Sequence, residues 1–407
     1  MSGKIILAPG REKSVLRHHL WIYSGAIRKI EGSPQAGDVV EVVSSDGKFL
    51  ARGGYSPASQ IPVRIWTFDP EELVDHACFK RKIQAAVAMR AAQGLLNPQG
   101  GCRVVAAEGD AIPGLIADRY GNFLCIQIVA AAMEPWRDTV TELLVEALAP
   151  YVKIKGVYER SDLKVRAKEQ LPERTGLLWG SLPPAEVEIV ENNCIYGVDL
   201  LSGHKTGFYF DQRENRRIVA EQAKGKRVLN LFSYTGGFGV AAAQCGATEV
   251  LNIDSSEAAL QMSKRNFERN GLSLQTNQHL EGDVFSLLRK LRGDRNARYD
   301  VIVLDPPKLI ESQRAMKRGC RAYKDAALQC FHLLKPGGRL FTFSCSGLME
   351  SDLFQKITFD AASDANIEAV IERKLMQAMD HPIALNHPET FYLKGLQVFR
   401  RTEPLTQ

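Results

Sequence analysis

One residue suited to nucleophilic chemistry is a cysteine at the end of an apolar segment. Cys345 lies between Ser344 and Ser346, where residues 339–345 are predicted to form a strand. A thiolate can add to the electron-poor C6 of a pyrimidine and make C5 a carbon nucleophile, and basic neighbours would favour the thiolate over the thiol. Most free cysteines simply fill space in a core, and we expect this of the other cysteines.

An aspartate and two prolines end another apolar segment, residues 299–305. Proline fixes the backbone and lacks an N–H group, so this motif would leave carbonyl groups without internal partners. In enzymes that methylate exocyclic amines, a comparable motif is followed by an aromatic residue that stacks on a flipped base. A lysine takes that place here, which argues against simple amine methylation. We predict Asp305 and Cys345 as catalytic residues, Asp305 also as a cofactor-binding residue, and Pro306, Pro307 and Lys308 as substrate-binding residues.

A glycine-rich loop follows a third apolar segment, residues 227–232, and opens a helix. Glycines allow the backbone to pass close beneath a ligand. The loop lacks the G-x-G-x-x-G spacing that suits a dinucleotide pyrophosphate, and by itself it could equally be a structural turn. The residues of this segment that we predict to bind a cofactor are Phe232, Tyr234, Thr235, Gly236, Gly237 and Phe238.

Two aspartates stand at the ends of the next two strands of the pattern. Asp254 is placed to accept hydrogen bonds from a pair of ribose hydroxyls. A helix starts at residues 255–257, so Asp254 could cap that helix and bind a ligand at once. Asp283 follows the third strand, where it could accept from an adenine amino group while Phe285 packs nearby. Such groups at three successive strand ends are far more specific than any one of them.

Strands and helices alternate through the C-terminal half of the chain. The predicted strands cover residues 227–232, 249–254, 299–305 and 339–345, and the predicted helices cover 239–245, 256–270, 284–291 and 323–334. This alternation predicts an open parallel α/β sheet, and such sheets bind ligands at the carboxyl ends of their strands. Every motif above falls at such an end. A cofactor loop, a ribose-binding acid and an Asp-Pro-Pro motif in this order predict a class I (Rossmann-like) methyltransferase domain that uses S-adenosylmethionine.

Three domains are expected from the length of 407 residues and from the change of pattern along the chain. Residues 1–72 are β-rich, with a turn at Asp46-Gly47 and a Gly53-Gly54 pair that allows a bulge or a close backbone approach. Residues 73–185 mix helices with strands and end near a Pro-rich boundary, and residues 186–407 form the α/β domain.

Charge and composition limit the class of protein. The net charge of +5 permits a nucleic-acid partner without requiring one. Residues 308–324 carry six basic side chains against one acid, and by itself this run could be a solvated helix face. Because it follows the Asp-Pro-Pro motif, we predict that Arg314, Lys317 and Arg318 contact the substrate.

Targeting and metal-binding signals are weak. No apolar run is long enough to span a membrane, and the N-terminus does not have the apolar segment of a secretory signal, so we expect a cytoplasmic protein without a membrane partner. The eight cysteines include no C-x-x-C pair, and we predict no metal site.

The whole chain resembles a known family, the bacterial 23S ribosomal RNA 5-methylcytosine methyltransferases of the large subunit methyltransferase I type. The motifs that carry the resemblance are GDVVEVVSSDGKFLARGGYSP, TGFYFDQRENR, VLNLFSYTGGFG, NIDSS, LDPPK and SCS. The first is similar to a PUA domain, an RNA-binding β-barrel, and the middle segment is similar to a small α+β insert. The resemblance implies that TGFYFDQRENR lies over the cofactor, with Phe208, Tyr209, Asp211 and Arg213 near it. From the residues alone, this motif could instead be a solvent-facing helix start.

The resemblance implies transfer of a methyl group from S-adenosylmethionine to C5 of a cytosine in 23S rRNA, through a covalent Cys345–C6 adduct. One feature of other RNA 5-methylcytosine enzymes, a second cysteine beside the Asp-Pro-Pro-like motif, is replaced here by Lys308, so the group that removes the C5 proton stays open. The alternatives are an RNA base N-methyltransferase, such as a guanine-N7 enzyme, and a non-catalytic RNA-binding assembly factor. The intact Ser-Cys-Ser favours cytosine.

Overall fold

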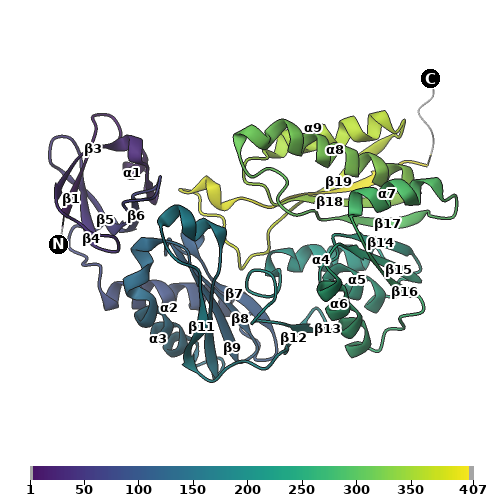
Figure 1. Cartoon of the computed structure of the whole chain (residues 1–407), viewed down its shortest axis with the longest axis horizontal. Helices are drawn as coiled ribbons and strands as arrows, with labels where there is room; N and C mark the ends of the chain where they lie inside the picture. The colour runs from purple at the N-terminus through teal and green to yellow at the C-terminus, as the bar shows by residue number, and fades with distance from the viewer. Residues whose placement is uncertain (1–2, 403–407) are drawn as a thin grey trace. The chain divides into compact units, whose positions relative to one another are not determined.

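The computed structural model describes residues 3–402, and the chain folds into two compact units (Figure 1). Unit 1 comprises Met1–Ile189, Val198–Phe210 and Met379–Thr390, and unit 2 comprises Val190–Gly197, Asp211–Ala378 and Phe391–Gln407. The two-stranded sheet of β12 (Val187–Glu191) and β13 (Cys194–Val198) lies where the chain passes from one unit to the other.

Unit 1 begins with a six-stranded sheet around a small apolar core. In spatial order its strands are β2 (Trp21–Ile22), β6 (Val63–Thr67), β5 (Phe49–Tyr55), β4 (Val39–Val43), β1 (Gly3–Leu7) and β3 (Ile27–Gly32), with the short helix α1 (Lys13–Leu16) after β1. The register of β5 against β6 shifts between Arg52 and Gly53, and a Cβ at Gly53 would lie 2.1 Å from the Arg64 carbonyl oxygen. The predicted bulge and close backbone approach at this glycine pair are therefore confirmed.

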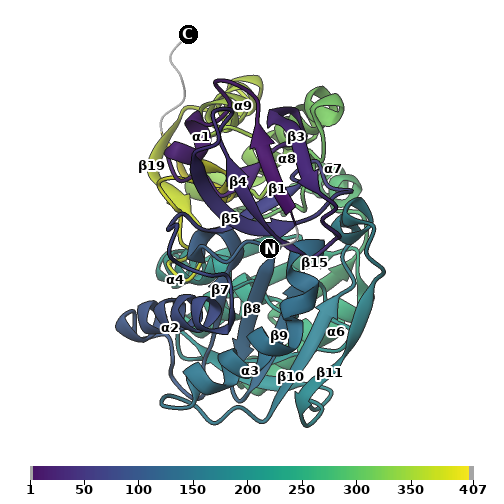
Figure 2. The same cartoon turned by 90° about the vertical axis from the view of Figure 1, so that its left-hand side faces the viewer.

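The rest of unit 1 is a five-stranded sheet with two helices packed against it (Figure 2). The strands in spatial order are β11 (Arg174–Gly180), β10 (Gly156–Ser161), β9 (Phe123–Ile128), β8 (Leu115–Tyr120) and β7 (Gly101–Ala106), and the helices are α2 (His76–Ala92) and α3 (Arg137–Leu148). Apolar residues of both helices are buried in the core of this sheet, since each helix turns its apolar side chains toward the strands.

The two sheets of unit 1 share buried contacts. Trp66 of β6 packs edge-on against Phe79 of α2, with ring centroids 5.1 Å apart, and its indole N–H donates to the Pro113 carbonyl at 3.3 Å. The Arg64 guanidinium forms a buried ion pair with the Glu169 carboxylate at 2.8 Å. The N-terminal sheet thus keeps its own small core, but Trp66 packs into the core of the segment that follows, so removal of the first 72 residues would leave a gap in that second core.

Unit 2 is a seven-stranded sheet. Its strands in spatial order are β16 (Asn277–Glu281), β15 (Glu249–Asp254), β14 (Arg227–Leu231), β17 (Tyr299–Leu304), β18 (Leu334–Ser344), β20 (Lys394–Arg400) and β19 (Ala369–Met376). The first five are parallel, and β20 is antiparallel to both β18 and β19. The chain builds outward from β14 to β16 and then returns to β17 on the other side of β14. Ligands bind at such a reversal of strand order.

Helices cover both faces of this sheet (Figure 1). One group of contacting helices is α4 (Arg213–Glu221), α5 (Gly237–Gln244) and α6 (Glu257–Arg269), and the other is α7 (Val284–Gly293), α8 (Met316–Leu333) and α9 (Ser351–Asp364). The predicted class I α/β architecture is confirmed. The helix predicted from residue 323 instead begins at Met316, because its first two turns carry charged residues without the apolar spacing used to recognise it. Among the described residues, no helix is long and apolar enough to cross a membrane.

The buried Arg64–Glu169 pair generates a stability prediction. Arg64→Met should lower the free energy of unfolding by about 3–5 kcal/mol, because it leaves the Glu169 carboxylate buried without its cation. The matched control is Lys29→Met, which removes the exposed partner of Glu31 and should change stability by less than about 0.5 kcal/mol. Urea denaturation of both variants measures the difference, and equal stability of the two would contradict a structural role for this buried ion pair.

Candidate active site at the strand ends of unit 2

Strand register brings the predicted site residues of unit 2 to one edge of the sheet. Leu231 at the end of β14 pairs with Ile253 of β15 on one side and with Leu304 of β17 on the other. Asp254 and Asp305 are each the next residue along their strands, so they flank the end of β14. This edge lies at the reversal of strand order, which is where the sequence placed the site.

The backbone of the glycine-rich loop is held in an uncommon conformation. Phe232 and Tyr234 have φ angles of +57° and +48°, although neither is a glycine. Left-handed backbone at non-glycine residues is costly and is often found at ligand sites. Gly236 also has a positive φ, and a Cβ there would lie 2.2 Å from the Ser263 hydroxyl oxygen. The loop is therefore a tight turn, with strain at two of the predicted cofactor-binding residues.

Asp254 accepts hydrogen bonds from two backbone N–H groups. Its Oδ2 accepts from Tyr234 N at 2.8 Å, and its Oδ1 accepts from Ser256 N at 2.9 Å. The expectation that Asp254 caps the following helix is wrong, because the N-cap of α6 is Ser256, whose hydroxyl accepts from Ala259 N. These bonds fix the carboxylate beside the loop. Each oxygen has a second lone pair with which it can accept a hydroxyl.

The glycine-rich loop also presents a buried polar group. Ser233 is only 6% exposed, and its hydroxyl oxygen has no hydrogen-bond partner within residues 3–402. Thr235 is similarly buried, and the Phe238 ring stacks on Phe343 at 5.7 Å. An unsatisfied buried hydroxyl is costly, so a polar ligand at this edge would relieve a penalty that the protein otherwise carries.

The adjacent strand end supplies an aromatic pair. The rings of Phe232 and Phe285 lie 5.8 Å apart at 69°. Asp283 is exposed and caps α7 by accepting from Ser286 N at 2.8 Å. Hydrogen bonds from Ser286 lower the pKa of this carboxyl group, so Asp283 remains an anionic acceptor. The structure thus packs Phe285 against Phe232 of the loop. Asp283 is the N-cap of α7, and its predicted contact with adenine stays a prediction.

Asp305 is oriented by a residue that the sequence interpretation missed. The Gln212 side-chain N–H donates to Asp305 Oδ2 at 3.1 Å, and the Gln212 carbonyl oxygen accepts from Asn215 at 2.6 Å. Asn215 in turn donates to the Met376 carbonyl at 3.0 Å. Gln212 lies within the TGFYFDQRENR motif, so the motif itself was the signal that could have identified it.

Cys345 and its two serine neighbours contact different parts of the protein. The hydroxyls of Ser344 and Ser346 are buried and lie 3.0 and 3.2 Å from the Tyr323 hydroxyl of α8. Cys345 is partly exposed, and its thiol lies 4.0 Å from the Pro306 carbonyl oxygen. The two serines therefore hold the chain while the thiol contacts the Asp-Pro-Pro motif, as a nucleophile beside that motif would require.

The TGFYFDQRENR motif is divided between the two units. Phe208 and Tyr209 belong to unit 1, where the Phe208 N–H donates to the Tyr120 hydroxyl at 3.2 Å. In unit 2, Asp211 is buried and accepts from the Tyr392 hydroxyl at 2.7 Å, and Arg213 is buried 3.4 Å from Glu191. This burial rules out the alternative of a solvent-facing helix start.

The basic run after the Asp-Pro-Pro motif forms one exposed face. Arg314 precedes α8, and Lys317, Arg318 and Arg321 follow at positions that recur on one side of a helix. Among the described residues, these four side chains have no ion-pair or hydrogen-bond partner. Lys324 differs, because it pairs with Asp364 at 2.7 Å. We call Arg314, Lys317, Arg318 and Arg321 the α8 cationic face.

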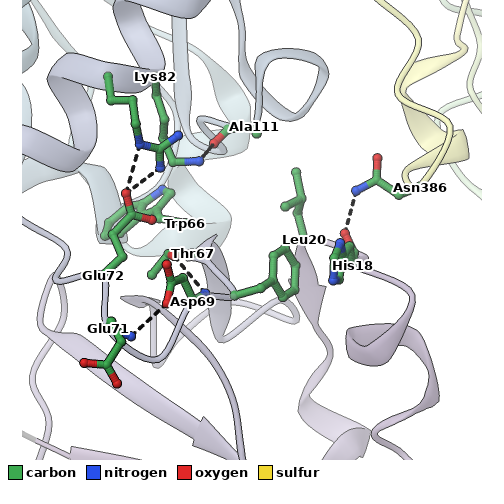
Figure 3. Close-up of a pocket in the computed structure, with 12 residues that line it drawn as sticks. His18, Leu20, Trp66, Thr67, Asp69, Glu71, Glu72, Lys82, Ala111 and Asn386 are labelled. Carbon is green, nitrogen blue, oxygen red and sulfur yellow. Dashed lines mark hydrogen bonds and ion pairs between the residues drawn. The ribbon is translucent and has the colours of Figure 1, made fainter.

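A pocket of about 640 Å³ lies in unit 1 and was not anticipated (Figure 3). The His18 ring stacks on Phe68 at 4.4 Å, and the Lys82 ammonium donates to the Ala111 carbonyl at 3.1 Å. The remaining charged groups of its lining are Asp69, Glu71, Glu72 and Arg81, and Arg81 pairs with Glu72. Because acids outnumber the lysine and arginine, this pocket is poorly suited to a phosphate.

Unit 1 also contains a group of side chains that could be mistaken for a metal site. Among the described residues, ligand atoms of His19, His387 and Glu389 lie within 4.8 Å of one another. The His19 Nδ1 accepts from the Trp21 N–H at 3.2 Å, so its Nε2 carries the proton that it donates to Glu389 at 3.2 Å. That proton occupies the position a metal would need. Burial lowers the pKa of His387 to about 4, so its ring packs as a neutral imidazole.

Comparisons with known proteins agree with this architecture. A profile of the S-adenosylmethionine-dependent methyltransferase family matches residues 165–382, and a PUA-like domain profile matches residues 5–68. The chain is 51% identical to a ribosomal RNA large subunit methyltransferase I from Aeromonas hydrophila, over 98% of this chain and 100% of that protein. It is 50% identical to the protein of the same name from Tolumonas auensis, over 98% and 99% of the two chains.

Solved structures show a similar fold at lower identity. A Streptococcus mutans protein assigned as a SAM-dependent methyltransferase aligns with a TM-score of 0.83 and 23% identity, over 97% of this chain and 99% of that chain. A second solved methyltransferase, in complex with SAH (S-adenosylhomocysteine), aligns with a TM-score of 0.82 and 23% identity over the same shares. The buried Ser233 hydroxyl, the fixed Asp254 carboxylate and the Phe232–Phe285 pair fit the nucleoside part of such a cofactor.

Asp254→Ala should weaken binding of S-adenosylhomocysteine by about ten- to a hundred-fold, because charge-assisted hydrogen bonds contribute about 1.5–3 kcal/mol. The control is Glu257→Ala, which removes an exposed acid one turn further along the chain and should leave the affinity unchanged. Isothermal titration calorimetry measures both. An unchanged dissociation constant for Asp254→Ala would remove this residue from the cofactor site.

Proposed function

The chain belongs to the ribosomal RNA large subunit methyltransferase I family, and from this premise we propose that it methylates C5 of a cytosine in 23S rRNA through a covalent bond between Cys345 and C6. The observation that carries the proposal is the position of the Cys345 thiol, partly exposed and 4.0 Å from the Pro306 carbonyl. A core cysteine would instead be enclosed by apolar side chains, as Cys330 is.

The proposed reaction begins with a cytosine that leaves its stack to reach the strand ends. Asp305, oriented by Gln212, holds the polar edge of the base at N3 or the amino group. The Cys345 thiolate adds to C6, and the π electrons of the C5–C6 bond shift to form a C4–C5 double bond, with the negative charge on N3 beside Asp305. C5 of this enamine would then attack the methyl carbon of bound S-adenosylmethionine, whose sulfur–methyl bond would break to release S-adenosylhomocysteine. A base, either a bound water or Asp305, then removes the C5 proton, so the double bond re-forms and the thiolate leaves.

The proposed cofactor contacts come from the strand ends of unit 2. Asp254 holds the ribose hydroxyls, and Asp283 accepts from the adenine amino group. Phe232 and Phe285 flank the adenine ring. The loop residues that enclose the cofactor are Tyr234, Thr235, Gly236, Gly237 and Phe238. The resemblance adds Phe208, Tyr209, Asp211 and Arg213 to this set. The strained φ angles of the loop and its unsatisfied Ser233 hydroxyl support this proposal.

RNA recognition is proposed to use the α8 cationic face, together with Pro306, Pro307 and Lys308. Cations without an internal partner are free to neutralise phosphates. The same argument limits which basic side chains of the N-terminal sheet are available to contact phosphates. Five of its nine basic side chains make ion pairs, whereas Arg11, Lys13, Arg17 and Arg28 are exposed without one among residues 3–402.

Cys345→Ala should bind RNA and S-adenosylhomocysteine normally yet form no 5-methylcytosine, since it lacks the thiolate that activates C5 in the proposed reaction. With RNA that contains 5-fluorocytosine, the wild type should accumulate a covalent adduct, because fluorine cannot leave as a proton does. Nucleoside mass spectrometry and denaturing gels measure the two effects. Cys320→Ala, which changes another partly exposed thiol, is the control and should retain both product and adduct.

The same experiment separates the alternatives. Residual C5 methylation by Cys345→Ala, or an adduct that maps to Cys320, would contradict the mechanism. A methylated guanine as the product would favour the N-methyltransferase alternative. Absence of any methylated nucleoside with the wild type would favour a binding factor.

The triple variant Arg314→Ala, Lys317→Ala and Arg318→Ala should bind RNA more weakly and with a shallower salt dependence. Each lost phosphate contact should reduce the slope of log K against log salt by about one. Lys324→Ala is the matched control on the same helix, because Asp364 already neutralises its charge. Fluorescence anisotropy at several salt concentrations measures the slopes, and equal slopes for the two variants would place RNA elsewhere.

A further inference from the structure

Lys394 is a buried cation without a carboxylate partner. It is the first residue of β20, it is 5% exposed, and it lies opposite Ser344 in the antiparallel pairing with β18. Its ammonium donates to the carbonyl oxygens of Ser346 and Tyr392, each at 2.9 Å. Within residues 3–402, no carboxylate forms an ion pair with it. Buried lysines are rare unless they are paired, because transfer of an isolated charge from water is expensive.

Lys394 lies beside both neighbours of Cys345. Register places the lysine opposite Ser344, and its ammonium reaches the carbonyl of Ser346, so the two serines beside the cysteine are both adjacent to it. The charge of Cys345 is accordingly close enough to affect the pKa of Lys394. Among residues 3–402, the Cys345 sulfur in its thiolate form is therefore a candidate counter-anion for the buried ammonium, which contacts the carbonyl of the next residue along the chain.

We propose that Lys394 is a positioning residue that holds Cys345 as a thiolate through the charge of its ammonium, without touching the substrate. The proposal rests on the proposed function, in which this thiolate attacks C6. The ammonium stabilises the anion before it reacts, and it stabilises the anion again when the sulfur leaves C6. The lysine itself transfers no proton in either step.

Other groups around this pair bear on its titration. Burial lowers the pKa of Lys394 to about 8, the charge of Cys345 raises it, and the exposed Lys308 lowers it further. The Phe391 ring lies 5.6 Å from the ammonium, and the Tyr323 hydroxyl, whose pKa is raised by burial, lies on the α8 side of the cysteine segment. An ammonium with this pKa is charged at neutral pH and becomes neutral in mild alkali, so its support for the thiolate is present below about pH 8 and is lost above it.

The test is the alkylation of Cys345 by iodoacetamide as a function of pH, followed peptide by peptide with mass spectrometry on the full chain. Only the thiolate reacts, so the rate reports the ionised fraction. In the wild type, the Cys345 profile should have its midpoint at least one unit below that of Cys320, whose pKa is raised by burial. A Cys345 midpoint at or above that of Cys320 would overturn the proposal without any variant.

Substitutions separate charge from packing. Lys394→Met keeps the length of the side chain and removes the charge, so the Cys345 midpoint should rise and the alkylation rate at neutral pH should fall about tenfold or more. Lys394→Arg keeps a cation and should restore most of the rate, which a purely structural role would not predict. Lys335→Met is the control, since it removes a lysine that pairs with Asp300 near the start of β18. An unchanged Cys345 profile in Lys394→Met would overturn the proposal.

Alkylation is independent of the RNA product, so the two proposals can fail separately. A low Cys345 midpoint that depends on Lys394, in an enzyme that forms no 5-methylcytosine, would support the charge pair and reject the proposed target atom. Formation of 5-methylcytosine by an enzyme whose Cys345 titrates independently of Lys394 would support the proposed function and reject the positioning role.

Discussion

The arrangement of unit 2 depends on the parallel pairing of β14 with a neighbour on each side. Leu231 is in register with Ile253 and with Leu304, so three strands end at the same level. The backbone pairing therefore brings the residues that follow Leu231, Ile253 and Leu304 to the same edge of the sheet. A shift of one residue in either pairing would turn Asp254 or Asp305 to the opposite face of the sheet.

This dependence explains which features could be predicted from the sequence. Apolar runs that end in Asp254, Asp305 and Cys345 are local signals, and the alternation of elements around them indicates a parallel sheet. Gln212 and Lys394 are different, because each reaches the edge from a segment remote in sequence from the residue it serves. Lys394 arrives through an antiparallel strand that returns to β18, and neither its polarity nor its neighbours distinguish it from an exposed lysine before the fold is known.

Interactions within the protein also prepare the edge for a ligand. The Asp254 carboxylate is fixed by the backbone N–H groups of Tyr234 and Ser256. The Asp305 carboxylate is fixed by the side-chain amide of Gln212, which Asn215 holds in turn. Side chains restrained in this way lose little conformational entropy when they bind, so more of each contact contributes to affinity and orientation. Gly236, against Ser263, and Phe232, with its positive φ, lie in the same loop as Tyr234, whose N–H donates to Asp254.

The packing of Trp66 into the core of the second sheet of unit 1 has a consequence for how such proteins can change over evolutionary time. Trp66 belongs to the N-terminal sheet, yet its ring lies among residues of the following helices and its indole N–H donates to Pro113. A cut or a recombination point after residue 72 would therefore separate Trp66 from the core into which it packs. If the N-terminal sheet were exchanged for that of a distant relative, the residues that replace Trp66 and Arg64 would not be matched to Pro113 and Glu169 in the segment that follows. The N-terminal sheet and the sheet that receives Trp66 are therefore expected to tolerate exchange only as a pair.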